Sequence, residues 1–282
     1  MAVELEALAP GVSLRQRRVR AKRPAEPAEN RVHDDEAARR LGFKAGLVPG
    51  VIVYAWMTHP VVEALGVRWV ERGTFLVRFA RPIYYGEEAT VSARVAARTP
   101  DSVTIEVSAF NSAGELCATA SAGLALGQPP APPEPSAYPA APLPAERPVV
   151  SRRHLASLGV LGTPELDLDE AAALRFLNQV DESSPLYLGV GAPAHPALYL
   201  DQANRAVDRN VRVSPWIHAE SEGRHLGLIR VGERLSTRGK IKSLFERKGH
   251  EFVELDLLLV ANGSRPVAAI RHVAIYKLRQ SA

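Results

Sequence analysis

The sequence predicts an α+β fold made of two similar units, and three observations support this prediction. An apolar segment with helical periodicity precedes a set of strand-like segments, and the same order returns in the second half of the chain. The spacing also returns, because Gly50 to Gly86 and Pro196 to Gly232 both span 36 residues. A proline-rich segment separates the halves. One helix packed on an antiparallel sheet, formed twice, is an α+β architecture.

The proline-rich segment sets the predicted domain boundaries. Nine of the 22 prolines lie between Gly127 and Pro148, which excludes a regular helix or a central strand there. We therefore expect an extended, semi-rigid linker over 127–148. It joins an N-terminal unit over 1–126, which begins with a basic arm, to a C-terminal unit over 149–282.

Each predicted unit contains one long helix followed by four strands. The helices are expected over 50–65 and 197–210, where apolar residues recur with helical spacing. The strands are segments rich in β-branched residues and bounded by Gly, Pro or Asn. They are 74–79, 89–97, 102–110 and 116–126 in the first unit, and 224–230, 235–245, 251–261 and 267–278 in the second.

Composition excludes several classes of protein. The 282 residues are 46% hydrophobic, which suffices for one large core or two modest ones. The single cysteine, Cys117, excludes an intramolecular disulfide and a cysteine-rich zinc site. Metal-ligand motifs, phosphate loops and dinucleotide fingerprints are absent from the sequence, so we expect no metal and no cofactor. The residues from Met1 to Leu5 do not begin an export signal, and no long apolar run occurs, so we expect a cytoplasmic protein without a membrane span.

The segment from Asn30 to Gly50 contains the clearest motif. It reads Asn-Arg-Val-His-Asp-Asp-Glu-Ala-Ala-Arg-Arg-Leu-Gly-Phe over 30–43 and Gly-Leu-Val-Pro-Gly over 46–50. This segment resembles the MaoC-type (R)-specific enoyl hydratase and dehydratase family. There, Asp-x-Asn-Pro-x-His is followed by an alanine-bearing helix, a Gly-Phe turn and an apolar pair leading to His-Gly at a helix start. The resemblance implies a hot-dog fold, and two such units in one chain make a double hot-dog.

Both units depart from the motif of that family. In the first unit, Asn30 and His33 stand at the family positions, but Ala28 occupies the place of the acid and Arg31 that of the proline. In the second unit, the segment from Glu182 to Tyr187 has the same spacing, with Glu for Asp, Ser for Asn and Tyr for His. Neither unit contains the complete acid and histidine pair.

The resemblance implies a hydro-lyase that hydrates a 2-enoyl thioester or dehydrates a 3-hydroxyacyl thioester. Such a reaction requires a general acid and base around one water, and a donor to the thioester carbonyl. We expect His33 to be the base and Asn30 to orient it. The N–H of Gly50, at a helix N-terminus, would contact the carbonyl. Asp201 or Glu182 would supply the acid.

The assignment of Asp201 depends on a second resemblance. The run from His195 to Asp201 is similar to the His-Pro-Ala-Leu-Leu-Asp segment of polyketide-synthase dehydratases, with one extra residue. These are also double hot-dogs, in which the first unit contributes the histidine and the second an aspartate. The Leu-Val-Pro-Gly run and a following tyrosine resemble the first half of that family. From these segments and the one from Glu182 to Tyr187 we expect substrate contacts from Val48, Pro49, Tyr54, Tyr187 and His195.

Other interpretations remain open. His33 could be a helix-terminal residue and Asp201 part of a solvated helix face. Double hot-dog acyl-CoA thioesterases also use a central-helix aspartate, which here would act with Asn204, Ser236 or Thr237. A third possibility is a non-catalytic protein that binds an acyl thioester.

The formal net charge is +4, and much of the positive charge is local. It lies in the run from Arg15 to Arg23 and in a group of Lys240, Lys242, Arg247 and Lys248. These residues form either a solvated face or a dock for the phosphates of coenzyme A. The expected partner is an acyl-CoA or acyl-carrier-protein substrate, so coenzyme A or phosphopantetheine belongs to the substrate. We expect no nucleic acid and no membrane partner, and a monomer or homodimer.

Overall fold

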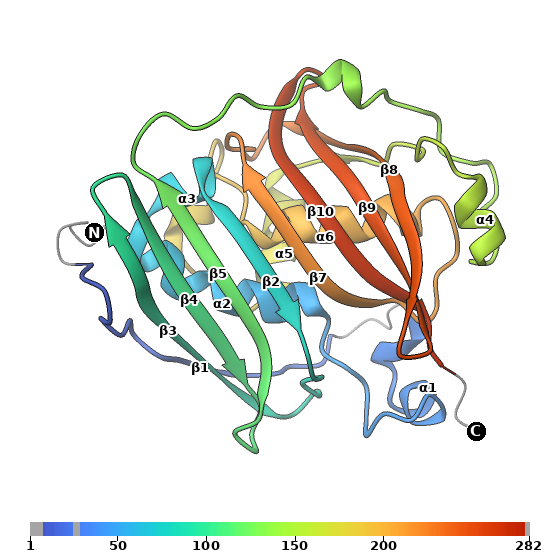
Figure 1. Ribbon diagram of the computed structural model, residues 1–282, viewed down its shortest axis with the longest axis horizontal. Helices are drawn as coiled ribbons and strands as arrows, with labels where there is room; N and C mark the ends of the chain where they lie inside the picture. The colour runs from blue at the N-terminus through green and yellow to red at the C-terminus, as the bar shows by residue number, and fades with distance from the viewer. Residues whose placement is uncertain (1–7, 25–28, 280–282) are drawn as a thin grey trace.

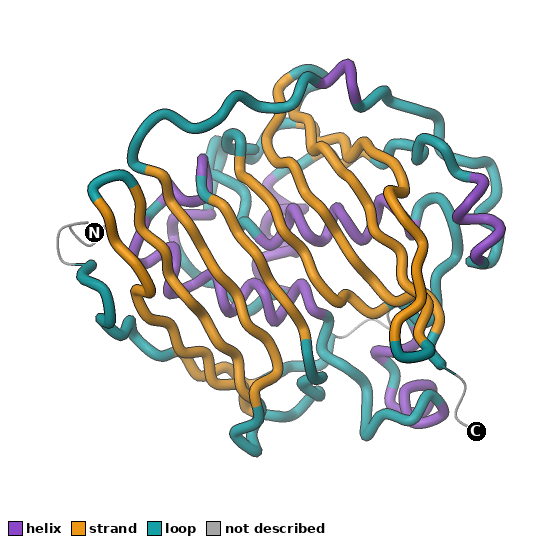
Figure 2. Tube along the Cα trace, in the orientation of Figure 1, coloured by secondary structure: helices purple, strands orange, loops and turns teal. Residues whose placement is uncertain are grey.

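The computed structural model describes residues 8–24 and 29–279, and the described strands form one antiparallel sheet (Figures 1 and 2). The strand order is β1-β3-β4-β5-β2-β7-β10-β9-β8-β6. Strands from the first half of the chain therefore form one side of the sheet, and strands from the second half form the other. The two halves meet where β2 (Thr74–Phe79) pairs with β7 (Ile217–His225). The predicted α+β class is confirmed.

The remaining strands, the α-helices and the 3-10 helices have the following bounds. The remaining strands are β1 (Arg17–Arg20), β3 (Glu88–Thr99), β4 (Ser102–Phe110), β5 (Leu116–Ala125), β6 (Glu165–Asp167), β8 (Arg234–Arg247), β9 (His250–Ala261) and β10 (Arg265–Lys277). The helices are α1 (Asp35–Arg40), α2 (Gly50–Leu65), α3 (Val67–Arg72), α4 (Arg152–Ser157), α5 (Glu170–Gln179) and α6 (Ala197–Asp208). Short 3-10 helices lie at η2 (Arg31–His33), η3 (Pro135–Ala137) and η4 (Pro185–Tyr187).

The long helices α2 and α6 lie side by side behind the sheet in Figure 1 and contact each other. Because α2 is apolar around its whole circumference, it is buried between the sheet and its neighbours, and only its ends reach polar surroundings. The buried side chains of both helices belong to one hydrophobic cluster with both halves of the sheet. The two units therefore share one core.

The strand predicted over 224–230 is wrong, because the strand β7 occupies Ile217–His225. Its buried positions are His218, Ser221, Gly223 and His225, so it lacks the apolar alternation by which half-buried strands are recognised. A β-bulge also shifts the register with β10: Glu220 pairs with Val273, whereas His218 pairs with the next residue. This bulge breaks the two-residue period of the strand.

The linker predicted over 127–148 contains η3 and otherwise runs as a loop along one edge of the molecule (Figure 1). The basic arm includes the short edge strand β1, which pairs with β3. Among the described residues, no helix is long and apolar enough to cross a membrane.

The join between the two halves gives a stability prediction. Gly223 lies between β2 and β10, where an added Cβ would be 2.6 Å from Cζ of Phe75 and 2.7 Å from the carbonyl oxygen of Ala269. We expect Gly223→Ala to lower the free energy of unfolding by about 1 to 3 kcal/mol, because the packed strands must separate. Gly227→Ala is the matched control, since an added Cβ there meets no atom closer than 3.5 Å. Equal denaturant midpoints for the two variants would contradict the prediction.

Candidate functional site

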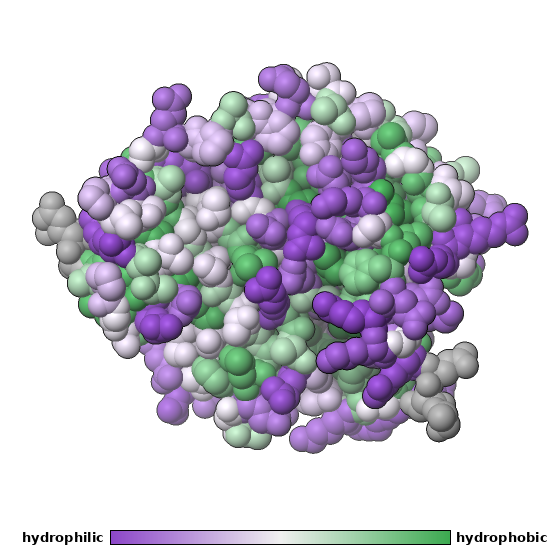
Figure 3. Space-filling model, viewed as in Figure 1, coloured by the Kyte–Doolittle hydropathy of each residue, from purple (hydrophilic) through white to green (hydrophobic). Residues whose placement is uncertain are grey.

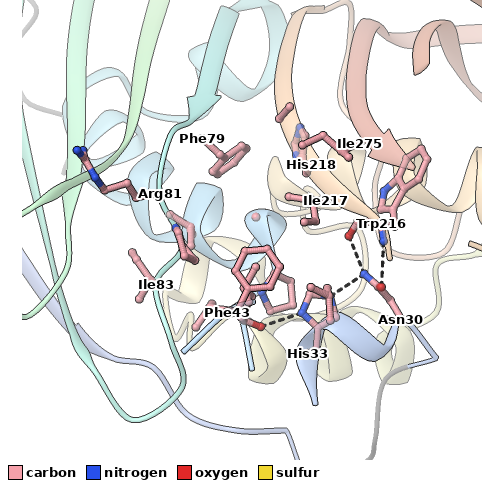
Figure 4. A pocket seen from close by; sticks show the side chains of 18 of the residues that line it. Asn30, His33, Phe43, Phe79, Arg81, Ile83, Trp216, Ile217, His218 and Ile275 are labelled. Atoms are coloured by element: carbon pink, nitrogen blue, oxygen red, sulfur yellow. Dashed lines mark hydrogen bonds between the residues drawn. The ribbon is translucent and has the colours of Figure 1, made fainter. Parts of the chain in front are cut away.

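A cavity of about 310 Å³ lies where the end of β2, the start of β7 and the N-terminus of α2 meet. In the orientation of Figure 3, this face of the molecule is hollowed below the sheet, with apolar surface inside a hydrophilic rim. Figure 4 shows residues from both halves of the chain facing each other across the cavity. The polar groups that line it are Asn30, His33, Arg81, Asn204, His218 and His250.

Local hydrogen bonds hold the segment that contains His33. Asp34 caps α1 by accepting from the N–H of Ala37 at 2.9 Å, as an aspartate at the N-cap position does. Asp35 accepts from the N–H of Gly46 at 2.7 Å, which fastens the loop that leads to α2. Gly46 lies directly against this segment, because an added Cβ would be 2.4 Å from the carbonyl oxygen of His33. Asp34 and Asp35 therefore hold the backbone on both sides of His33, from α1 to the loop before α2.

The hydrogen bonds of His33 define its tautomer. Its Nδ1 lies 2.8 Å from the carbonyl oxygen of Leu47, which can only accept, so Nδ1 carries a proton. Its Nε2 lies 3.2 Å from Nδ2 of Asn30. Burial lowers the pKa of His33, and the bond to Leu47 opposes this only in part. The neutral ring therefore presents the lone pair of Nε2 to the amide of Asn30 on the cavity wall.

Asn30 connects the first half of the chain to the second. Its Nδ2 donates to the carbonyl oxygen of Trp216 at 2.7 Å, and its Oδ1 accepts from the N–H of Trp216 at 3.1 Å. The indole N–H of Trp216 donates to Oδ1 of Asn204 on α6 at 2.7 Å. These bonds fix the amide of Asn30 independently of His33, as Figure 4 shows.

Gly50 begins α2 at the wall of the cavity. The N-cap residue, Pro49, supplies no side-chain hydrogen bond to the first turn. The first N–H groups of a helix have no acceptor within the helix and carry its positive dipole end. An added Cβ at Gly50 would lie 3.3 Å from the side chains of Phe79 and His218. Glycine thus leaves the helix N-terminus accessible to a ligand.

The structure places the expected substrate contacts in different surroundings. Val48 and Pro49 line the cavity with Gly50. Tyr54 does not, because it lies in the core beside Phe75 with its ring 5.6 Å away. Tyr187 and His195 line a separate small pocket against α5, with their rings 4.8 Å apart.

Asp201 is not among the residues that line the cavity. Its carboxylate accepts from Nε of Arg205 at 2.8 Å and from Gln202 at 3.1 Å. The pair with Arg205 joins residues one helical turn apart on α6. The structure therefore does not bring Asp201 to His33, and the expected pairing of the two is not supported.

Glu182 contacts the C-terminal half of α2, away from Gly50. It accepts from Nδ1 of His59 at 3.0 Å and from Nη1 of Arg17 at 3.3 Å. The N–H groups of Ser183 and Ser184 donate to its other oxygen at 2.9 and 2.8 Å. His59 follows Gly50 by nine residues, which is roughly 13 Å along a helix axis. Glu182 is therefore also separate from His33, and Ala28, which replaces the acid of the motif, lies outside the described residues.

The surroundings of Glu182 keep its carboxyl group ionised at neutral pH. Burial alone would raise its pKa, but the bonds from His59 and Ser184 and the charge of Arg17 outweigh burial and lower the pKa to about 2. Arg17 and His59 belong to the first half of the chain and Glu182 to the second, so this cluster ties the halves together. Nearby, burial lowers the pKa of His195 to about 3.

The arrangement of the sheet and helices is shared with known structures. A protein from Chloroflexus aurantiacus described as a MaoC domain dehydratase is 12% identical, with 99% of this chain and 98% of that chain covered and a TM-score of 0.69. A conserved Mycobacterium tuberculosis protein with a double hot-dog fold is 16% identical, with 97% and 98% covered and a TM-score of 0.67. The chain has the double hot-dog fold.

A third solved structure with a similar fold carries a different description. A Lactobacillus plantarum protein described as an oleoyl thioesterase is 10% identical over 95% of this chain and 98% of its own, with a TM-score of 0.53. No protein-family model matches the sequence. No curated protein matches it either. At these identities the likeness defines the double hot-dog fold and leaves the activity open.

The basic run from Arg15 to Arg23 was expected to be either a solvated face or a phosphate dock, and most of its cations have carboxylate partners. Four of its cations are paired with carboxylates: Arg17 with Glu182, Arg18 with Glu88, Lys22 with Asp181, and Arg23 with Asp35. A different groove, of about 820 Å³, shares Leu278 with the cavity of the double hot-dog. Its charged residues are Arg40, Arg152, Lys277, Arg279 and Glu251.

Several cavity residues were not predicted. Trp216 and His218 lie on or beside β7, whose polar pattern concealed the strand. Phe79 and Arg81, at the end of β2, would have required knowledge of the β2 and β7 pairing. In the described part of the chain, no group of three or more His, Cys, Asp or Glu side chains is placed to hold a metal ion.

The Glu182 cluster gives a prediction on stability and pH. The folded pKa of about 2 lies below the ordinary value of 4.5, so ionised Glu182 stabilises the fold at neutral pH. We expect Glu182→Gln to lower the free energy of unfolding by about 3 kcal/mol at pH 7. The difference between variant and wild type should be complete above about pH 5 and should shrink as pH falls toward 2.

The control for this prediction is Glu63→Gln. Glu63 lies 3.4 Å from the other nitrogen of His59, but its side chain is 44% exposed. Its replacement should change the free energy of unfolding by well under about 1 kcal/mol. Chemical denaturation from pH 3 to 7 measures both variants, and a pH-independent loss in Glu182→Gln would contradict the charge-based explanation.

Proposed function

We propose that the protein hydrates a 2-enoyl thioester, and reversibly dehydrates the 3-hydroxyacyl thioester, in the cavity between its two halves. The observation that carries this proposal is the placement of a neutral histidine and an open helix N-terminus on one cavity wall. His33 offers the lone pair of Nε2, and Gly50 begins α2 without a side chain. A base and a carbonyl donor are the two groups that this reaction most needs.

The proposed reaction uses His33 twice. With the thioester carbonyl at the N–H of Gly50, a small shift of the His33 ring exchanges the amide of Asn30 for a water as the partner of Nε2. Nε2 takes a proton from this water while its oxygen bonds to C3 and the double-bond electron pair moves to C2 and the carbonyl oxygen. The imidazolium then returns the proton to C2. Protons balance with one base, so no carboxylate is required. Asn30 stays fixed by Trp216 throughout.

The residues of the thioesterase alternative support hydrolysis less well. Asp201 is bonded to Arg205 and Gln202 outside the cavity. Asn204 does line the cavity, but its Oδ1 already accepts from Trp216. Ser236 donates to the carbonyl oxygen of Val260 on the neighbouring strand, and neither Ser236 nor the buried Thr237 lines the cavity. Among the described residues, then, the groups expected for hydrolysis do not converge on one position.

The cavity walls favour a small apolar acyl group. Beside the polar groups, the lining is made of aliphatic and aromatic side chains such as Val53, Phe79 and Ile275, and its volume is at the lower end for small-molecule sites. The adjoining basic groove would accept phosphates of coenzyme A or phosphopantetheine. We therefore propose a short-chain thioester carried by one of these groups.

The test follows enoyl absorbance and free thiol together, with crotonyl-CoA and 3-hydroxybutyryl-CoA as substrates. We expect the wild type to change enoyl absorbance without releasing thiol. His33→Gln should slow hydration about 10² to 10⁴-fold, because it removes the base. His154→Gln, at an exposed histidine on α4, should leave the rate unchanged. Thiol release that survives His33→Gln would favour a thioesterase, and binding without turnover would favour a binding protein.

The rate of hydration should also depend on pH in a defined direction. Neutral His33 is the active form, and burial lowers its pKa below the ordinary value of 6.5. We therefore expect the acidic limb of the kcat/KM profile to lie below pH 6.5, with activity lost as pH falls through the lowered pKa. A limb above pH 6.5 in the free enzyme would contradict this role of His33.

A further inference from the structure

Three buried side chains form a hydrogen-bonded chain beside the cavity. Nε2 of His218 lies 2.8 Å from Oγ of Ser221, and this oxygen lies 2.8 Å from Nδ1 of His272. Ser221 and His272 face each other directly across the β7 and β10 pair. All three side chains are at least nine-tenths buried. Neither the motif resemblance nor the proposed reaction uses them.

A β-bulge makes the hydrogen bonds among these three side chains possible. Residues three apart on a regular strand face opposite sides of the sheet. In β7, the register with β10 slips between Glu220 and His218, so the extra residue turns His218 to the same buried face as Ser221. Such bulges often re-aim a side chain next to an active site.

The other nitrogen of His218 lies at the cavity. His218 lines the cavity, and its Nδ1 would be 3.3 Å from a Cβ built on Gly50. In the part of the chain that the structure describes, this buried Nδ1 has no hydrogen-bond partner. A buried polar atom without a partner is costly unless a ligand supplies one. Figure 4 shows the ring beside Phe79 and Ile275, facing the interior of the cavity.

The hydrogen bonds among His218, Ser221 and His272 favour one tautomer of His218. Within the described residues, Nε2 of His272 also has no partner. An unpaired buried N–H is rarer than an unpaired buried acceptor. Either order of donors through Ser221 leaves one outer ring N–H without a protein partner among the described residues, and His272 does not line the cavity. A ligand can accept from this N–H only if it belongs to His218, which lines the cavity. We therefore infer that His272 is protonated at Nδ1, from which it donates to Ser221. The hydroxyl of Ser221 then donates to Nε2 of His218, and this leaves the single proton of His218 on Nδ1.

We propose that His218, held in the Nδ1–H form by Ser221 and His272, is the second donor to the thioester carbonyl, beside the N–H of Gly50. This assignment rests on the proposed function, since it names the carbonyl of that substrate as the ligand. His218 is then a catalytic residue, because it touches the oxygen on which charge develops. Ser221 and His272 are positioning residues that act through it.

The electrostatics of the cluster agree with this role. Burial lowers the pKa of His218 well below its ordinary value, and the charge of His272 would lower it further. Burial lowers the pKa of His272 to about 3. Both rings are therefore neutral at physiological pH. A neutral imidazole N–H can polarise a carbonyl without being consumed as an acid, so the donor remains in place throughout the reaction.

Two measurements on the full chain test the assignment. Nitrogen-15 NMR of labelled histidines reports which ring nitrogen of His218 carries the proton. The absorbance of bound 2,4-hexadienoyl-CoA reports polarisation of its carbonyl, because the band moves to longer wavelength as the carbonyl is polarised. Binding of the same thioester is measured separately by calorimetry.

We expect the Nδ1–H form of His218 and a red shift of the bound dienoyl band in the wild type. His218→Phe should bind the thioester with the red shift reduced and hydrate crotonyl-CoA about 100-fold more slowly. Ser221→Ala keeps the imidazole but should weaken the Nδ1–H signal and reduce the red shift, by no more than His218→Phe does. If His218→Phe does not fold, the NMR signal and the red shift of Ser221→Ala are sufficient to test the assignment. Ser92→Ala, at a half-buried serine of β3 outside the cavity, should behave as the wild type.

The outcomes separate this assignment from the proposed function. Wild-type His218 protonated at Nε2, or an unchanged red shift in Ser221→Ala, would overturn the assignment while hydration and its dependence on His33 remain. A wild type that binds no dienoyl thioester would overturn the proposed function and the assignment with it.

Discussion

The pairing of β2 with β7 is the constraint on which the rest of the structure depends. Five residue pairs, from Thr74 with Arg224 to Arg78 with Glu220, join two half-sheets into one. The antiparallel direction places the end of β2 beside the start of β7. Residues 79–83 and 216–219 therefore reach the same end of the sheet, opposite the N-terminus of α2. Each half alone would supply one wall of the cavity, and only their pairing closes it.

The two halves have the same plan but different environments at their motif segments. In the first half, Asn30 and His33 open onto a cavity. In the second half, the carboxylate of Glu182 accepts hydrogen bonds from Arg17, His59 and two backbone N–H groups. An ionised carboxylate with four donors is a stabilising anion and a poor proton donor. We therefore interpret the second segment as the structural counterpart of the first.

Local patterns predicted most of the fold. The limits of α2 follow from Pro49 before it and Gly66 after it, and the predicted range agrees with the structure. β2 and β4 were also predicted at their observed limits, because β-branched and aromatic residues are frequent in them. β7 could not be predicted, because its core face consists of histidine, serine and glycine and a bulge interrupts its period. The feature that hid the strand is the one that builds the polar cluster at the cavity.

The candidate site was predictable only where it is local in sequence. Asn30, His33 and Gly50 fall within one short segment, and hydrogen bonds within that segment bring them together. The acid had to be sought elsewhere in the chain, and neither choice reaches the cavity. The four-residue spacing of Asp201 and Arg205 on a predicted helix already indicated an ion pair between them. The side-chain partners of Glu182, Arg17 and His59, are more than a hundred residues away, so no sequence pattern revealed them.

In the proposed complex, an acyl thioester lies between the two halves with its carbonyl at the start of α2. A crystal structure of the slowed His33→Gln variant with crotonyl-CoA bound is the decisive measurement. We expect the carbonyl oxygen within hydrogen-bond reach of the N–H of Gly50, and C3 of the acyl chain facing residue 33. An acyl chain bound outside the cavity, or a carbonyl turned away from α2, would contradict it.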